Sequence, residues 1–172
     1  MRWFMCLRYY AEAKVLLCSH LSKALCVFRI KMEIFEIQLR NSIGPVKLGM
    51  TETEVINVIG APNCIYGHRH HFLDGLMVDF DNEGRVEFIE AAVSELFSTT
   101  LLGFDVHRAL ATNVLERIQL EGNYDHSDPE LGYSYVFKEL QLSFWRPTLP
   151  DLEEGEGLYF QSVAIASEGY FE

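Results

Sequence analysis

The chain has 172 residues, 49% of them hydrophobic, and a formal net charge of −11 at pH 7. This is enough apolar material for one domain, or for two small halves sharing a core, to fold without a metal or disulfide. The four cysteines, Cys6, Cys18, Cys26 and Cys64, do not have the spacing of a disulfide framework or a zinc knuckle. We therefore expect a reducing, cytoplasmic compartment, and neither a metal nor a cofactor.

Charge is distributed unevenly along the chain. Residues 1–31 hold six basic residues and one acid, which leaves eight basic and twenty-four acidic residues in 32–172, a formal charge of −16. Such an acidic body repels the phosphate backbone, which argues against nucleic acid as a partner and favours a basic protein. The alternative is that the charge serves only solubility.

Residues 1–31 are basic and apolar, and they lack the turn-forming residues that recur later. Lys14, His20 and Lys23 interrupt the apolar stretches, so none approaches the roughly 20 residues of a membrane span. A secretory signal needs a longer apolar middle, and the residues before Cys18 (Leu-Leu) and Cys26 (Ala-Leu) fit a lipidation signal poorly, because it places small residues just before the cysteine. We predict an extension at 1–31, from an upstream start or a loosely attached helix, and a domain at 32–172.

The domain is predicted to begin with an edge strand, because the segment from Met32 to Leu39 alternates apolar and polar residues. A helix follows. Thr51 and Glu54 form a capping-box pattern at its start, and Gly60 is a stop signal. Three strands are then predicted, near 71–73, at 76–80 and at 85–93, the last two joined by the turn sequence Asp-Asn-Glu-Gly.

The same pattern recurs in the second half. Leu102–Asp105 matches Leu48–Thr51, with Asp105 as a second helix cap. Spacing by four predicts a second amphipathic helix with the stripe Val106, Leu110, Val114 and Ile118. Strands are predicted at 133–140, 140–146 and 158–166, the last two separated by an acidic loop.

These elements predict an α+β fold of two tandem helix-plus-three-strand repeats. Repeat one covers about 43–93 and repeat two about 99–167. Internal repetition of this kind indicates that each unit buries its apolar face against the other. We expect one antiparallel sheet with both helices on one face and the other face open.

The phrase L-G-M-T-x-x-E-V-x-x-x-x-G-x-P, residues 48–62, followed by a hairpin, resembles the β-lactamase inhibitor protein fold group. That group includes the SmpA/OmlA outer-membrane lipoprotein family. The resemblance covers about 43–92 well and 99–166 loosely, and it implies a protein-binding module that grips its partner with an open sheet face. The chain departs from the inhibitor, which has a disulfide in each repeat, because Cys64 is the only cysteine in the repeat region. By analogy, an acidic, cysteine-poor version suits a bacterial toxin-immunity protein.

The histidines are the strongest candidates for chemistry. His68, His70 and His71 lie together, and His68 and His70 would share a strand face where they could ligate zinc. The alternative is a polar turn, because Arg69 between them repels a cation. His107 and His126 are predicted to be solvated surface residues. No nucleophile elbow or phosphate-binding glycine loop is present.

Aromatic and acidic residues of the second half are the predicted partner-binding site. Tyr and Trp on the open face of a sheet are typical interface anchors, and a run of acids would attract a basic partner. The predicted residues are Tyr133, Tyr135, Trp145, Tyr159, Asp151, Glu153, Glu154 and Glu156. The alternatives are that the rings fill the core beneath the second helix and that the acids form only a solvated loop.

We therefore predict a non-enzymatic protein-binding module, an inhibitor or immunity protein that neutralises a basic toxin or nuclease domain. One alternative is an envelope assembly factor lipidated at Cys18 or Cys26. The other is a small-molecule binder or metal-dependent enzyme that uses His68 to His71. The sequence leaves the oligomeric state open.

Overall fold

The computed structural model describes residues 32–172, which belong to one compact unit, Lys31–Glu172. The predicted extension at 1–31, with Cys18 and Cys26, lies outside the described residues and stays a prediction. The described part is mixed α and β, with two α-helices and two largely antiparallel sheets. None of its helices is long and apolar enough to cross a membrane.

One sheet has five strands in the order β3-β2-β1-β8-β9. They are β1 (Glu33–Gln38), β2 (Ser42–Ile43), β3 (Val46–Lys47), β8 (Phe97–Leu101) and β9 (Phe104–Asp105). The prediction that the first strand is an edge strand is wrong, because β1 pairs with β2 on one side and, in parallel, with β8 on the other. This position buries the apolar side of β1, where Phe35 stacks on Phe97 with the ring centroids 4.5 Å apart.

The other sheet has seven strands in the order β10-β11-β12-β7-β6-β5-β4, each antiparallel to its neighbours. They are β4 (Cys64–Tyr66), β5 (Arg69–Phe72), β6 (Leu76–Phe80), β7 (Val86–Ala92), β10 (Ser134–Phe137), β11 (Leu142–Trp145) and β12 (Ser162–Ala166). The predicted strands at 76–80 and 85–93 are confirmed as β6 and β7. In β6 the alternation is complete, since Leu76, Val78 and Phe80 are buried and the residues between them are not.

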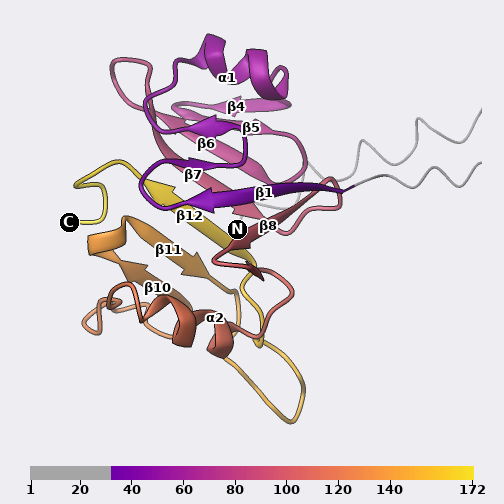
Figure 1. Ribbon diagram of the computed structural model, residues 1–172, viewed down its shortest axis with the longest axis vertical. Coiled ribbons are helices and arrows are strands. Elements are labelled where there is room, and N and C mark those ends of the chain that lie inside the picture. Colours follow the sequence, from indigo (N-terminus) through magenta and orange to yellow (C-terminus); the bar gives the residue numbers. More distant parts are fainter. Residues whose placement is uncertain (1–31) are drawn as a thin grey trace, which may run out of the picture. The chain divides into compact units, whose positions relative to one another are not determined.

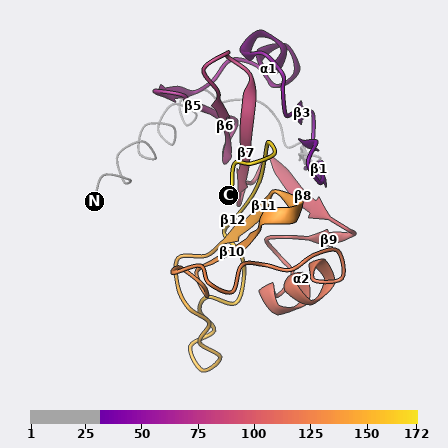
Figure 2. The same cartoon turned by 90° about the vertical axis from the view of Figure 1, so that its left-hand side faces the viewer.

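The two helices and the five-stranded sheet lie on the same face of the seven-stranded sheet (Figures 1 and 2). The core fills the space between these layers, where Val55, Val114, Phe35 and Phe144 belong to one buried cluster. The predicted mixed α and β fold is confirmed, but the prediction that one antiparallel sheet holds all the strands is not, because the chain forms two sheets. The short strands that precede each helix form a second sheet, which shares the covering of this face with the helices.

Helix α1 (Glu52–Ile59) has the predicted boundaries for the predicted reasons. The Glu54 N–H donates to the Thr51 hydroxyl at 3.3 Å, and the Thr51 N–H donates to the Glu54 carboxylate at 2.7 Å, which completes the capping box. These bonds from Thr51 lower the pKa of Glu54. The helix ends at Gly60, which has a φ of 87°. Its role is structural, because Val55 is fully buried against the sheet.

Helix α2 (Ala111–Ile118) begins later than predicted, and Asp105 is not its cap. One carboxylate oxygen of Asp105 accepts from the His107 N–H at 3.1 Å, and the other accepts from the Ser98 hydroxyl at 2.7 Å. The Asp105 side chain therefore closes a turn next to β8. Val106 is fully buried in this turn, before the helix starts.

The remaining face of the seven-stranded sheet is called the outer face. Side chains of paired residues point the same way, so the pairing of Trp145 with Ser162, and of Phe88 with Ala166, places all four on this face. Tyr170 packs on Phe88 from the chain's last residues. The predicted open face is thus covered by the chain itself at Phe88.

Candidate functional site

Three strands of the seven-stranded sheet have ends that lie side by side. β10 begins at Ser134, β11 ends at Trp145 and β12 begins at Ser162, and these residues are paired in register. The segments that leave this end contribute Tyr133, Tyr159 and the loop 147–158. Together with Trp145 they form what we call the hairpin end.

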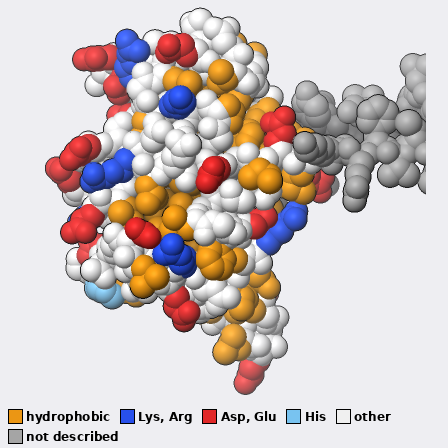
Figure 3. Space-filling model, in the orientation of Figure 1, with side chains coloured by type: hydrophobic (Ala, Val, Ile, Leu, Met, Phe, Trp, Pro, Cys, Tyr) orange, Lys and Arg blue, Asp and Glu red, His pale blue; other side chains and the backbone are white. Residues whose placement is uncertain are grey.

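The hairpin end takes its name from a short hairpin in the loop 147–158. This hairpin, Asp151–Glu156, projects at the bottom of Figure 1. Figure 3 shows hydrophobic and acidic side chains on this projection. The Asp151 N–H donates to the Glu156 carbonyl at 2.9 Å. The Asp151 carboxylate accepts from the N–H groups of Glu153 and Glu154 at 2.8 and 3.0 Å. Bonds made by the backbone and the side chain of Asp151 therefore shape the hairpin, and Leu152 at its tip is 87% exposed.

A buried arginine holds the base of this loop. Arg146 is 4% exposed and donates to the carbonyls of Gly132 and Gly157, at 2.7 and 2.8 Å, and to the Tyr135 hydroxyl at 3.0 Å. Its guanidinium carbon also lies 5.5 Å from the centre of the Tyr135 ring and 5.8 Å from that of Phe160. No carboxylate in 32–172 forms an ion pair with it. Carbonyl oxygens and ring faces therefore offset the buried charge.

Glycines allow the close packing at this base. Gly157 has a φ of 62°, and a Cβ there would overlap the Leu149 carbonyl. Gly132 has a φ of 104°, and a Cβ there would lie 2.7 Å from the Leu149 side chain. Gly155, nearer the tip, has a φ of 73° with nothing within 4 Å. The loop is thus tightly packed where it leaves the sheet and open where it projects.

The hairpin presents unpaired negative charge beside apolar surface. Glu153, Glu154 and Glu156 are exposed, and their carboxylates make no hydrogen bond or ion pair with the described residues. Leu149 and Leu152 are 49% and 87% exposed. An exposed apolar anchor surrounded by like charges fits a protein surface that is apolar at the centre and basic around it.

The structure brings most of the predicted site residues together. Tyr133, Trp145 and Tyr159 are 41%, 44% and 40% exposed at the hairpin end, next to the predicted acids. Tyr135 is the exception and must be removed from the predicted surface. Its ring faces the covered side of the sheet, with its centroid 5.8 Å from that of the buried Phe160.

Two residues of the site were missed from the sequence. Leu152 lies between acids in the sequence. Because these acids predicted a polar loop, the apolar residue at its tip was not predicted to be part of the site. Arg146 follows Trp145 at the end of a strand, where a charged side chain usually faces solvent. The local signal in the sequence is the Gly-x-Gly pattern at 155–157, which suggests turns with positive φ. Gly157 does have a positive φ at the tightly packed base of the loop.

The histidine group does not converge on a common site. His68 is exposed in a turn, while His71 lies on the outer face and His70 on the covered face. His70 is 8% exposed, with its ring 4.8 Å from Phe80 and its Nδ1 3.4 Å from Glu52 without hydrogen-bond geometry. Residues 32–172 hold no group of three His, Cys, Asp or Glu side chains placed for a metal. His68, His70 and His71 thus do not form the shared metal site that the alternative prediction requires.

His107 was predicted to be a solvated surface residue, and this is wrong. Its Nδ1 lies 3.1 Å from the Phe160 carbonyl and therefore donates to it, while its Nε2 is buried without a partner among the described residues. Desolvation lowers the pKa of His107, so the ring is neutral at pH 7. Its role is to hold the chain where it enters β12.

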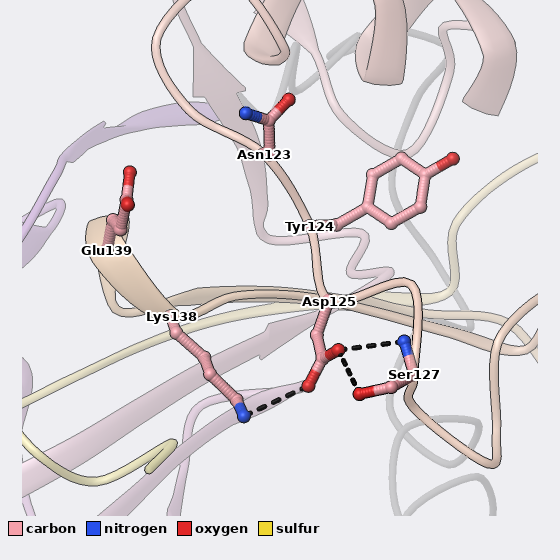
Figure 4. A pocket seen from close by; sticks show the side chains of 6 residues that line it. All are labelled: Asn123, Tyr124, Asp125, Ser127, Lys138 and Glu139. Carbon is pink, nitrogen blue, oxygen red and sulfur yellow. Dashed lines mark hydrogen bonds and ion pairs between the residues drawn. The ribbon is translucent and has the colours of Figure 1, made fainter.

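A shallow depression of about 300 Å³ lies next to β10 (Figure 4). It is lined by Asn123, Tyr124, Asp125, Ser127, Lys138 and Glu139. The Asp125 carboxylate accepts from the Ser127 hydroxyl at 2.6 Å and pairs with the Lys138 ammonium at 2.9 Å. Hydrogen bonds from Ser127 and Lys138 hold the pKa of Asp125 well below its usual range. A carboxylate that stays ionised in this way is a poor proton carrier at neutral pH, so we assign it a structural role.

Comparisons with protein-family models, with curated proteins and with solved structures find no match to this chain.

Proposed function

We propose that this protein is a non-enzymatic binding module that captures a basic protein partner with its hairpin end. The observation that carries the proposal is the preformed hairpin, with Leu152 exposed at the tip and three unpaired glutamates around it. Ordering the loop before binding reduces the entropy lost on association, which favours tight capture. The acids would speed the encounter with a basic surface.

The inhibitory or immunity role rests on the resemblance to the β-lactamase inhibitor protein fold group. It is supported by the mirrored strand order of the seven-stranded sheet, which runs outward from β7 and β12 through β6 and β11 to β5 and β10. Two tandem repeats joined at their last strands would give this order. A cytoplasmic location is part of the proposal and rests on cysteine usage alone.

The test compares two hairpin variants with a matched control. Leu152→Asp removes the apolar anchor, and a triple Glu-to-Gln variant at 153, 154 and 156 removes the charge. A control triple Glu-to-Gln variant at 36, 83 and 116 makes the same change in net charge at exposed sites elsewhere. A partner is isolated from the native host on the wild-type chain, purified, and its affinity for each variant is measured at several salt concentrations.

We expect Leu152→Asp to weaken binding by about 2 kcal/mol or more, as at interface hot spots, chiefly through faster dissociation. The hairpin charge variant should slow association and reduce its salt dependence. The control variant should keep more of the association rate and more of its salt dependence. Equal affinity of the hairpin variants and the control would place the interface elsewhere and refute the proposal.

A further inference from the structure

The outer face carries an aromatic position, at the opposite end of β12 from the hairpin end. Phe88 on β7 is 7% exposed and lies beside Ala164 and Ala166 in a small apolar cluster of its own, apart from the main core. The Arg69 guanidinium carbon lies 5.4 Å from the centre of the Phe88 ring. We call this position, Phe88 with the two alanines and Arg69, the aromatic seat.

The chain's last residues occupy the aromatic seat. The Tyr170 ring stacks on Phe88 with the centroids 5.0 Å apart, and Phe171 meets Phe88 edge-on at 6.3 Å. Few polar contacts hold this tail: the Ser167 N–H donates to the Glu87 carbonyl at 2.7 Å, and the Phe171 N–H donates to the Gln141 side chain at 3.4 Å. Tyr170 stays 42% exposed. The tail is therefore held mainly by its two rings.

Charge opposes this arrangement. Three carboxylates, those of Asp79, Glu87 and Glu90, and one base, Arg69, act on the Tyr170 hydroxyl, so acids outnumber bases around the seat; burial first, and then these acids, raise the pKa of Tyr170. Arg69 is itself paired with Asp79 at 2.7 Å and with Glu90 at 3.3 Å. The tail adds two exposed acids, Glu168 and Glu172, each two residues from Tyr170.

The relative size of the two effects decides how the tail behaves. An aromatic pair contributes about two- to tenfold to an equilibrium constant, while an exposed like charge opposes by about five-fold at most. The tail has two rings and two acids, so the repulsion can cancel much of the stacking, and the surface that the rings bury on Phe88 favours the docked tail by a small margin. A segment with the same rings and basic neighbours would keep the stacking and turn the repulsion into attraction.

We propose that the aromatic seat is a second docking site, for a basic, aromatic-bearing segment of the protein partner, and that the tail occupies it until this segment displaces it. The basic character of the segment rests on the proposed function. The seat itself and its present occupant are independent of the hairpin end.

The test uses the full-length chain and a labelled Lys-Gly-Tyr-Phe-Lys peptide, with its termini blocked, as the probe. Binding is followed by fluorescence anisotropy, and its location by amide hydrogen exchange in β7. An Asp-Gly-Tyr-Phe-Asp peptide with the same rings is the charge control. Three forms are compared: wild type, Tyr170→Ala with Phe171→Ala to empty the seat, and Glu168→Gln with Glu172→Gln to hold the tail more firmly.

We expect the emptied seat to bind the basic peptide about tenfold more tightly than wild type, which is the contribution of one aromatic pair. The Gln variant should bind it more weakly than wild type, and its Tyr170 and Phe171 amides should exchange more slowly. The acidic peptide should bind more weakly than the basic one in every form. If the emptied variant fails to fold, the proposal is tested by the Gln variant, through its peptide affinity and the exchange of its Tyr170 and Phe171 amides.

Equal peptide affinity in wild type and both variants, or peptide protection that does not include β7, would overturn the proposal. Leu152→Asp, at the hairpin end, should leave peptide affinity unchanged. A failure of the aromatic seat can thus be distinguished from a failure of the proposed function, because the peptide assay needs no hairpin residue and no natural partner.

Discussion

Arg146→Met is the sharpest test of how the hairpin end is built. The substitution removes three donors and leaves the carbonyls of Gly132 and Gly157 without their partners at a position that is 4% exposed. Each unpaired buried acceptor costs roughly 1–3 kcal/mol. Loss of the contacts with the two rings adds about 1–2 kcal/mol. Methionine carries no charge, so the cost of burying the guanidinium disappears and offsets part of these losses. We expect a net loss of about 3 kcal/mol in the free energy of unfolding.

Urea unfolding measures this loss, with Arg85→Met as the matched control. Arg85 is exposed and makes one 3.3 Å contact with the Gly49 carbonyl, so the control should lose no more than about 0.5 kcal/mol. Hydrogen exchange should also quicken at the Asp151 amide, which bonds across the hairpin. A loss in Arg146→Met as small as in the control, with unchanged exchange at Asp151, would show that Arg146 does not hold the hairpin base.

Three further predictions concern stability. Gly157→Ala should lower the free energy of unfolding by about 3 kcal/mol or more, and Gly155→Ala by about 1 kcal/mol. Both positions have positive φ, but only at Gly157 would the added Cβ also overlap the Leu149 carbonyl. Equal losses in thermal unfolding would contradict this. Thr51→Ala should lower it by about 1 kcal/mol and Thr51→Ser by much less, and similar losses would mean that the capping bond contributes nothing. The pKa of His107 is lowered by burial, so its stabilising contribution is complete above the unfolded pKa, about 6.5, and is lost as pH falls from there through the lower pKa of the folded state. His107→Gln should therefore flatten the decline of stability between about pH 7 and 5, and an unchanged slope in urea unfolding would refute the reasoning.

The elements that could be predicted from the sequence are those set by neighbours in the chain. Helix α1 is one, because Thr51 and Glu54 cap it through bonds over three residues. Strand β6 is another, because its alternation needs only one buried face. The parallel pairing of β1 with β8 joins segments more than sixty residues apart, and nothing local indicates it.

Local signals also failed where another contact used the same residue. Asp105 has the chemistry of a helix cap, but its carboxylate is engaged by the Ser98 hydroxyl on β8, and the helix starts at Ala111, five residues later than a cap at Asp105 would place it. Alternation along one strand sets Trp145 opposite to Phe144, but it could not say which face is covered, and Tyr135 pairs with Phe144 on the covered one. That depends on where the helices and the second sheet pack, which is a tertiary property.

The hairpin end and the aromatic seat can serve one partner. Both lie on or beside the outer face, at Ser162 and at Ala166, so they are separated by four strand residues, roughly 13 Å. A standard interface covers about 800 Å² of each protein, enough to span both.

Sites this far apart with no shared contacts should act independently. We therefore expect Leu152→Asp to weaken partner binding and Tyr170→Ala with Phe171→Ala to strengthen it. In the combined variant the two changes should add within about 0.5 kcal/mol. A larger coupling, measured as a double-mutant cycle against the purified partner, would show that tail and hairpin respond as one unit.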